Sequence, residues 1–272
     1  MARIVAGLGA PHSPSLPSTV QKNPAFVENG LYAELRRHLE EVKADVVLMF
    51  SNDHFNTFFL DNFPLFAVGV ASETSGPNDQ TPMPQYQIPV HEGLMAHIHR
   101  TGIQSGFDLT VTQEFKIDHA FAVPWHFIGT NSKIALAPIF VNCFSNPLPN
   151  ARRAHDLGRM IGSAIRNYKE PLRVAVFASG SFSLEIGGPQ IPVNERSGVP
   201  DRKWVDRIIH LLRNHAINDL IEEATPEQMT RAGNAGGELL NWIAMLGVIG
   251  DQVPIMLEPQ PHGHAFGVWR WE

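Results

Sequence analysis

The amino-acid sequence predicts a single α/β domain in which helices flank a central mixed sheet. Short apolar runs of strand length alternate along the chain with longer segments of helical spacing, which is the pattern of this fold class. The 272 residues suffice for one large domain with a complete core. No clear linker and no internal repeat interrupts them, so we expect one domain over residues 1–272.

Two of the predicted strands each lead into a histidine. Residues 3–9 form the first strand, and the proline-rich segment that follows places His12 in a stiff loop. Residues 44–50 are a continuous apolar run, typical of a strand buried on both faces, and His54 follows them closely. Because open α/β sheets carry their sites at the carboxyl ends of strands, we expect His12 and His54 at one edge of the sheet.

The other elements follow the same alternation. We expect helices over residues 25–43, 90–101, 150–168 and 200–214, and strands over residues 110–117, 134–140 and 172–178. Residues 72–89 are rich in Pro, Gly and polar side chains, which predicts a long irregular excursion that helps to shape a binding cleft. Residues 259–264 are also expected to be irregular, and they bear His262 and His264.

Glu238 stands between a glycine pair and the apolar run of residues 239–249. This order places its carboxylate in the first turn of a helix. Gly236 and Gly237 have no side chains, so they allow another backbone to come close at this point.

The composition limits the kinds of site that the chain can carry. The single cysteine, Cys143, excludes an internal disulfide and any cysteine-rich metal site, whereas 13 histidines favour imidazole and carboxylate ligands. A net charge of −6 without a run of Lys or Arg gives no indication of nucleic-acid or membrane-surface binding. No apolar run reaches the ~20 residues that span a bilayer, and no signal peptide is visible, so we expect a cytoplasmic protein.

His12, His54 and Glu238 would together supply two imidazoles and a carboxylate. Such a set leaves about three coordination positions open, which suits non-haem Fe(II) and its binding of substrate and O₂. Each residue also has a structural explanation, because a histidine after a strand commonly only hydrogen-bonds within its loop, and a glutamate at a helix start suits the helix dipole. The spacing alone leaves both interpretations open.

Five segments, in order along the chain, resemble the class III extradiol ring-cleaving dioxygenase family, and within it the catalytic β subunits of protocatechuate 4,5-dioxygenases and their gallate-cleaving relatives. Five ordered segments are more specific than any single motif. They are residues 1–16 with His12, the Asn52-Asp53-His54 motif, residues 118–124 with His119, the glycine-rich segment 179–189, and Gly237-Glu238-Leu239 with Trp242 and Met245.

The resemblance implies a cofactor, a reaction and roles for single residues. His12, His54 and Glu238 would bind Fe(II), and an aromatic ring with adjacent hydroxyls would chelate the iron and react with O₂. The ring would open beside the diol, and His119 would supply a proton while the oxygen–oxygen bond breaks. Asn52 is a candidate for a hydrogen bond to a substrate hydroxyl, although a turn residue before Asp53 explains it equally well.

One position departs from the family pattern. The glycine-rich segment of the family normally ends in a Ser-His pair whose histidine takes a proton from the bound diol, and Leu184 stands at that place here. Gly187, Gly188 and Pro189 keep the register. Leucine accepts no proton, so three explanations compete, of which the first two are favoured: another base, a substrate that needs none, or a relative without full activity.

The first explanation requires another group near the site, and the candidates are His264, His262 and Glu185. The second points to a ring with a more acidic hydroxyl, or to an aminophenol or hydroxypyridone. Other readings of the whole scaffold are a metal-dependent hydrolase or lyase, or a protein that binds a ligand without turnover. A homo-oligomer or a small α-type partner subunit fits the family, and the sequence does not choose between them.

Overall fold

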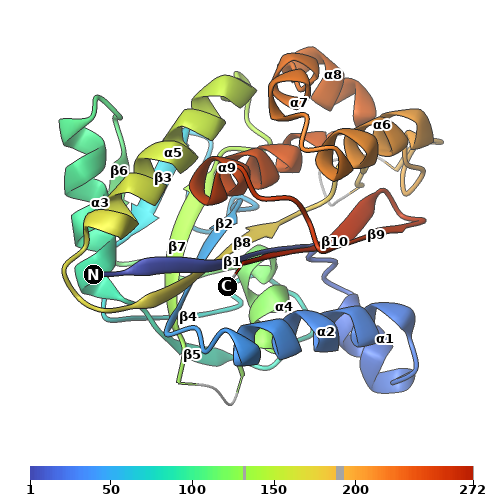
Figure 1. Ribbon diagram of the computed structural model, residues 1–272. Coiled ribbons are helices and arrows are strands. Elements are labelled where there is room, and N and C mark those ends of the chain that lie inside the picture. Colours follow the sequence, from blue (N-terminus) through green and yellow to red (C-terminus); the bar gives the residue numbers. More distant parts are fainter. Residues whose placement is uncertain (131–132, 188–192, 272) are drawn as a thin grey trace.

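Within residues 1–130, 133–187 and 193–271, which the computed structural model describes, eight strands form one mixed sheet (Figure 1). The strand order is β6-β3-β7-β2-β8-β1-β10-β9, and the four middle strands run parallel. Along the chain these strands are β1 (Arg3–Ala10), β2 (Val46–Ser51), β3 (Phe66–Gly69), β6 (Thr110–Thr112), β7 (Ala135–Val141), β8 (Arg173–Ser179), β9 (Met256–Gln260) and β10 (His264–Arg270).

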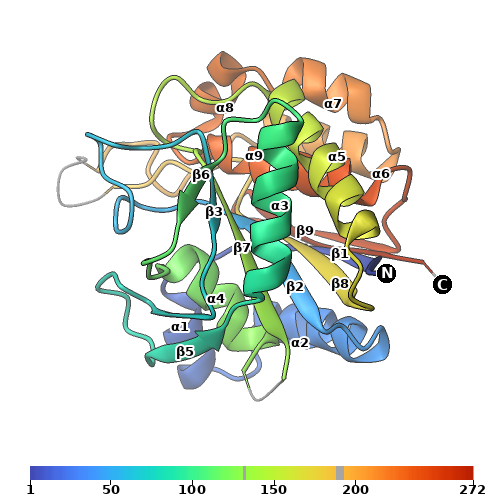
Figure 2. The same ribbon diagram turned by 90° about the vertical axis from the view of Figure 1, so that its left-hand side faces the viewer.

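Helices cover both faces of the sheet, which confirms the predicted fold class. Helices α5 (Ala151–Asn167) and α9 (Leu239–Ile249) pack together on one face, and α2 (Val27–Glu41) and α4 (His119–Ile128) lie on the other (Figures 1 and 2). All 11 residues of α9 are buried, so this helix forms part of the core. The remaining helices are α1 (Leu16–Lys22), α3 (Glu92–Gln104), α6 (Arg202–Arg213), α7 (Ile217–Glu223), α8 (Pro226–Ala232) and the 3₁₀ turn η1 (Gly236–Glu238). Among the described residues, no helix has both the length and the apolarity to cross a bilayer.

The structure corrects two expectations about irregular segments. Residues 72–89 contain β4 (Glu73–Gly76) and β5 (Tyr86–Pro89), which pair with each other in a separate antiparallel sheet. At the C-terminal end, β9 and β10 form an antiparallel pair, so His264 begins a strand instead of lying in a loop. Pro259 is compatible with this strand because β9 lies at the edge of the sheet, where a missing N–H is tolerated.

Helix α4 is one of the elements that the sequence pattern does not predict, as are α1, α7 and β3. Its ten residues begin at His119, and eight of them are buried. An apolar run without polar interruption shows no helical period, and Pro124 lies inside it, which obscures the helix further. The predicted strand over residues 110–117 shortens to β6, because residues 113–118 lead into the start of this helix.

The sheet order brings the two histidine-bearing loops together. Strand β8 pairs with β1 on one side and with β2 on the other, all three parallel. The loops that carry His12 and His54 therefore leave the same edge of the sheet, as predicted, on either side of the segment that follows β8. Gly180 opens this segment at φ +141°, and a Cβ there would lie 2.6 Å from Glu238 Cβ, so the close approach of Glu238 requires glycine.

Candidate metal centre

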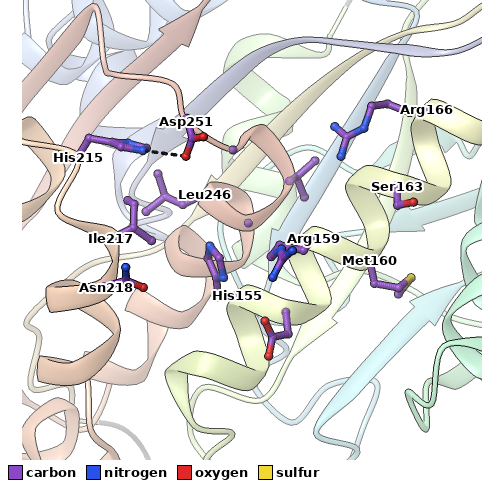
Figure 3. A pocket seen from close by; sticks show the side chains of 14 residues that line it. His155, Arg159, Met160, Ser163, Arg166, His215, Ile217, Asn218, Leu246 and Asp251 are labelled. Carbon is purple, nitrogen blue, oxygen red and sulfur yellow. Dashed lines mark ion pairs between the residues drawn. The ribbon is translucent and has the colours of Figure 1, made fainter.

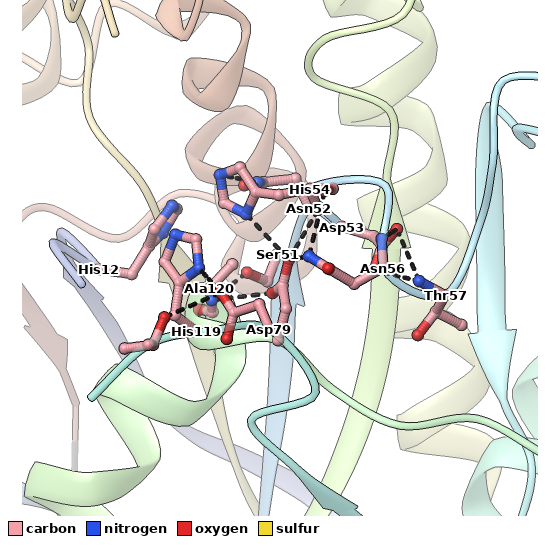
Figure 4. A network of polar contacts seen from close by, with 12 residues as sticks. His12, Ser51, Asn52, Asp53, His54, Asn56, Thr57, Asp79, His119 and Ala120 are labelled. Carbon is pink, nitrogen blue, oxygen red and sulfur yellow. Dashed lines mark hydrogen bonds and ion pairs between the residues drawn. The ribbon is translucent and has the colours of Figure 1, made fainter. Parts of the chain in front are cut away.

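Four side chains that can bind a metal gather at this edge of the sheet: His12, His54, His119 and Glu238, here called the donor cluster. Donor nitrogens of the three histidines all lie within 4.8 Å of one another, and Figure 4 shows these histidines together. Glu238 Oε1 lies 3.1 Å from His12 Nε2 and 4.0 Å from His54 Nε2. His12 and Glu238 are buried, so their polar atoms are largely removed from water.

His12 is held in one tautomer by the strand beside it. Ser179 Oγ donates its proton to the carbonyl of Ala120 at 2.7 Å, so it can only accept from His12 Nδ1, which lies 2.9 Å away. His12 therefore carries its proton on Nδ1 and presents the lone pair of Nε2 to Glu238 and the rest of the donor cluster. This arrangement is typical of histidines that bind metals.

His54 is held in the same way by a carboxylate. Asp118 Oδ2 accepts from His54 Nδ1 at 2.9 Å and from the His54 backbone N–H at 2.7 Å. Burial alone would raise the pKa of Asp118, but the nearby His54 and His119 and the hydrogen bonds from His54 lower it well below its usual range. Asp118 also caps α4, since its Oδ1 accepts from the Ala120 N–H at 2.9 Å.

Glu238 ends the 3₁₀ turn η1, which runs directly into α9, close to the helix start that the sequence predicts. Its Oε2 accepts from the Ser181 backbone N–H at 2.7 Å, which leaves Oε1 toward the imidazoles. Burial raises the pKa of Glu238, but His12, His54 and this hydrogen bond bring it below the usual value. The glycine pair has the predicted role, because a Cβ on Gly237 would lie 2.2 Å from the Cys143 carbonyl oxygen.

His119 begins α4 and lies against His54, with stacked rings whose centroids are 4.2 Å apart. Its Nδ1 forms a short ion pair with Asp79, which lies in the segment between β4 and β5 (Figure 4). Burial raises the pKa of Asp79, but the hydrogen bond and charge of His119 lower it overall. The segment 72–89 thus reaches the site through Asp79, whereas none of its residues is among those that line the cavity described next.

A cavity of about 570 Å³ adjoins the donor cluster, and its lining includes His12, His54, His119 and Glu238. Leu184 also lines this site cavity, together with Phe26, Ile186 and the two C-terminal histidines. A volume of several hundred cubic ångströms suits a small aromatic molecule. The donor cluster is therefore accessible to a ligand.

Glu28 and His264 form a buried pair in the lining of the site cavity. Glu28 comes from α2 and is 4% exposed, and His264 begins β10 and is 5% exposed. Glu28 Oε1 lies 3.2 Å from His264 Nε2. His262 is exposed, although it also borders the cavity. Of the two C-terminal histidines, His264 is thus the one held in a fixed environment.

Leu184 faces the cavity, whereas the side chains directly before and after it in the sequence form hydrogen bonds away from the cavity. Ser183 Oγ donates to the Ala232 carbonyl at 2.6 Å, and Glu185 Oε2 accepts from the Asn234 backbone N–H at 3.0 Å. Glu185 is absent from the described lining, so its carboxylate does not replace the missing histidine in this structure. Gly188 and Pro189, which support the register in the sequence, lie outside the described residues.

Asn52 is fully buried beside His54 and is absent from the described lining of the site cavity. Its Nδ2 lies 3.2 Å from His54 Nε2, and its Oδ1 lies 3.5 Å from Asn241 Nδ2. An amide so close to a ligand nitrogen can reach an atom bound next to it. The hydrogen bond of Asn52 to a substrate hydroxyl stays a prediction.

A second cavity, of about 860 Å³, lies between α5, α7 and α9 (Figure 3). Its lining includes His155 and Arg159, and His215 lies 3.5 Å from Asp251 there. None of the predicted site residues borders it. Among the described residues, no group of three or more metal-binding side chains gathers in this second cavity.

The sequence pattern gives no role to five residues that support the site: Asp79, Asp118, Ser179 and Ser181 contact the donor cluster, and Glu28 contacts His264. Asp118 has a local signal, since an Asp directly before a helix is a typical N-cap, but that signal is visible only once α4 is recognised. Asp79 and Glu28 meet their histidines across 40 and 236 residues of sequence, and no local pattern indicates such pairs.

Comparison with known proteins connects this geometry to a family. Residues 6–268 match the family described as the catalytic LigB subunit of aromatic ring-opening dioxygenase. A 2,3-dihydroxyphenylpropionate/2,3-dihydroxicinnamic acid 1,2-dioxygenase from Klebsiella pneumoniae (strain 342) is 26% identical over 283 residues, covering 90% of this chain and 84% of that protein. The enzyme of the same name from Escherichia coli (strain K12) is 27% identical over 285 residues, with the same coverage.

A solved structure shares the fold. An uncharacterized protein from Escherichia coli K12 matches with a TM-score of 0.59 and 11% identity, over 98% of this chain and 100% of that one. At this identity the match supports the fold alone. The family match, which extends over nearly the whole chain, carries the assignment: this chain belongs to the family of catalytic subunits of aromatic ring-opening dioxygenases.

Proposed function

We propose that this chain catalyses the Fe(II)- and O₂-dependent extradiol cleavage of a catechol-like ring, with iron held by His12, His54 and Glu238. The observation that carries the proposal is the convergence of these three side chains next to a ligand-sized cavity. Each has its remaining polar atom bound by another group, which leaves one donor atom of each for a metal. A purely structural cluster has no need of this arrangement.

The donor set fits Fe(II) chemically. Two imidazoles and one carboxylate leave coordination positions for an incoming diol and for oxygen, whereas thiolate ligands, which favour zinc, are absent from the described cluster. Iron bound there would supply Lewis acidity and would bring the ring and O₂ together.

A set of His12, His54 and His119 would also satisfy the distances between donor atoms. We favour Glu238 over His119 as the third ligand for two reasons. Glu238 is held with one free oxygen near both of the other ligands. His119 Nδ1 is already paired with Asp79, so this side chain has a partner outside the other three donors, and the family resemblance gives it the role of proton donor.

The second acid–base group in the proposal is His264. Leu184 cannot take a proton from the diol, and the lining offers His264 in its place, a buried imidazole held by Glu28. The carboxylate of Glu28 stabilises the imidazolium that forms when His264 accepts the proton. Asn52 would then orient a substrate oxygen from beside His54.

The relatives indicate the kind of substrate only in part. Their names specify rings with adjacent hydroxyls and an acidic side chain. About a quarter of the aligned residues are identical between these relatives and this chain. A catechol-like ring is common to them and to this proposal, and an aminophenol or hydroxypyridone remains among the substrates to be tested. A cytoplasmic location, and a homo-oligomer or a small α-type subunit as partner, stay predictions.

Oxygen uptake after anaerobic reconstitution tests the proposal. The metal-free protein is loaded with Fe(II) or with Zn(II), and a panel of catechols, aminophenols and hydroxypyridones is added before air. We expect one O₂ consumed per ring opened beside the diol, with Fe(II) only. Turnover that is supported by zinc and independent of O₂ would instead favour a hydrolase or lyase, and no turnover of any ring would favour a binding protein.

A further inference from the structure

The side chains that line the site cavity include two carboxylates, Glu28 and Glu238, but no Lys or Arg among the described residues. The neighbouring residues 188–192 have the sequence Gly-Pro-Gln-Ile-Pro, which contains no basic residue either. Arg196, in the loop that follows, donates to the Arg231 carbonyl at 2.6 Å and lies 3.8 Å from Glu185. A positive charge in the described lining must therefore come from an imidazole.

Each buried or half-buried imidazole of this lining already has an acidic partner or a metal-binding position. His12 and His54 face Glu238, and His119 faces Asp79. His264 faces Glu28. His262 is exposed, so solvent and salt screen any charge that it carries.

A carboxylate on the substrate would thus enter a lining that offers it no unpaired buried cation. Burying a carboxylate without a charged partner is costly, because its hydration is lost and is not replaced. Glu28 makes the environment less favourable still, since two like charges in a partly desolvated cavity repel each other.

The same lining has apolar and neutral polar groups for an uncharged substituent. Phe26, Leu184 and Ile186 contribute apolar surface, and the hydroxyl groups of Ser13, Ser15 and Thr19 contribute neutral hydrogen-bonding partners. Apolar walls with a few polar groups are typical of sites for uncharged small molecules.

We propose that the substrate is a catechol-type ring that carries no carboxylate, and that Leu184 and Glu28 select against one. The selected substituent is apolar, or is an uncharged group that can donate a hydrogen bond to the carboxylate of Glu28. This inference deepens the proposed function and rests on it. It also separates this chain from its relatives, whose names specify a propionate or a cinnamic acid side chain.

Anaerobic calorimetry on the Fe(II)-loaded protein tests the inference without turnover. The probes are 3,4-dihydroxybenzoate, 3,4-dihydroxybenzamide and 4-methylcatechol. The amide makes the ring hydroxyls more acidic than the carboxylate does, and the methyl group makes them less acidic. A preference for both neutral probes over the benzoate therefore cannot arise from hydroxyl acidity.

We expect the benzamide and 4-methylcatechol each to bind at least tenfold more tightly than the benzoate. Leu184→Arg should shift the ratio of benzoate to benzamide affinity at least tenfold toward the benzoate. Leu184→Gln is the matched control, which adds polar length without charge and should leave this ratio within threefold of the wild-type value. Glu28→Gln should shift the ratio in the same direction as Leu184→Arg, by a smaller factor.

The outcomes separate the two levels of the proposal. Benzoate binding as tight as that of the benzamide, in the wild-type protein, overturns the inference and leaves the proposed function intact. Failure of all three catechols to bind a protein with stoichiometric Fe(II) overturns the proposed function and the inference with it. A shift caused equally by Leu184→Arg and Leu184→Gln would show that size and polarity, and not charge, set the selection.

Discussion

The two sides of the site cavity differ in how they relate to the rest of the family. His12, His54 and Glu238 occupy the positions at which the resemblance places metal ligands. His12 donates to Ser179 at the end of β8, His54 donates to Asp118 before α4, and Glu238 accepts from Ser181 in the segment after β8. The Glu28–His264 pair lies elsewhere in the same lining, as does Leu184, the one position at which the family pattern is broken. The side that carries the proposed metal ligands fits the family pattern, and the side that carries Leu184 departs from it.

We infer from this difference that substitutions on one side of the cavity can leave the function of the other side unaltered. On the ligand side, His12 and His54 come from loops that leave parallel strands of the central sheet, so their placement follows from the sheet order, and Glu238 comes from η1 at the start of α9. The other side is assembled from α2, the loop after β8 and the C-terminal hairpin. Backbone N–H groups of Phe182 and Ser183 join the loop to Gly263 of the hairpin, and the Glu28–His264 side-chain pair joins the hairpin to α2. We expect substitutions on the first side to affect metal binding and those on the second to affect proton transfer and substrate choice.

The largest effect is expected from Glu238→Gln, which would break the ligand side alone. The amide keeps the size of the side chain but removes the charge that a metal requires, so ring opening should fall below detection. Metal analysis after reconstitution should show little iron. Fe(II) is expected to raise the melting temperature of the wild-type protein and to leave that of Glu238→Gln unchanged. Glu185→Gln is the matched control and should keep its iron.

His264→Gln should separate the two sides most clearly. Loss of one acid–base group typically costs about 10²–10⁴-fold in turnover, and we expect a decrease of that size with iron content unchanged. The pH dependence of kcat should lose the limb that belongs to the base. His262→Gln, in the exposed neighbour, should change turnover by less than about threefold because bulk water can replace a solvated group.

Full turnover of His264→Gln would assign the proton chemistry to the substrate and not to the protein. If His264→Gln keeps full turnover, the substrate needs no protein base, and the acidity of its hydroxyl must explain why Leu184 is tolerated. Leu184→His should then broaden the range of rings toward simple catechols. Initial rates with a series of ring substituents of different acidity would measure this.

An intermediate effect is expected from Asp118→Asn, which weakens the support of a ligand without removing the ligand. The amide oxygen can still cap α4, but the charge that holds His54 Nδ1–H is lost. Loss of such a supporting group typically lowers metal affinity by about 10–100-fold. Competition with a chelator of known affinity measures the change, and Asp156→Asn, at the second cavity, is the control that should leave affinity unaltered.

The smallest effect is expected from Tyr32→Phe, which lies between the two sides. The buried Tyr32 hydroxyl donates to the Pro11 carbonyl, next to His12, and Tyr32 follows Glu28 by one turn of α2. Removing the donor leaves a buried carbonyl without this partner, which costs about 1–3 kcal/mol of unfolding free energy. Urea unfolding should show that loss, while a change in iron affinity of more than tenfold would mean that Tyr32 positions His12 directly.

Much of the ligand side could be predicted from the sequence for a physical reason. Strands that are buried on both faces are apolar throughout, so residues 3–9 and 44–50 are recognisable, and the residues directly after them must lie at one edge of a parallel sheet. Glu238 is recognisable from the glycines that precede it, since close approach of two backbones requires them. The break at Leu184 is also visible, because only the identity of the residue is needed.

The other side of the cavity could not be predicted, because its contacts depend on tertiary packing. His264 lies in a segment rich in Pro and Gly, which predicts a loop, yet pairing with the edge strand β9 makes it the start of β10. Its partner Glu28 lies on an amphipathic helix, where a glutamate is expected to face solvent. Neither residue carries a local signal of burial, and only the fold brings them together.

The most direct test of the central claim is a crystal structure of the protein loaded with Fe(II) under anaerobic conditions, with anomalous scattering measured at the iron edge. The account predicts one iron bound by His12 Nε2, His54 Nε2 and a Glu238 carboxylate oxygen, with His119 left unbound beside it. Iron bound by the three histidines without Glu238, or iron outside this cluster, would contradict it.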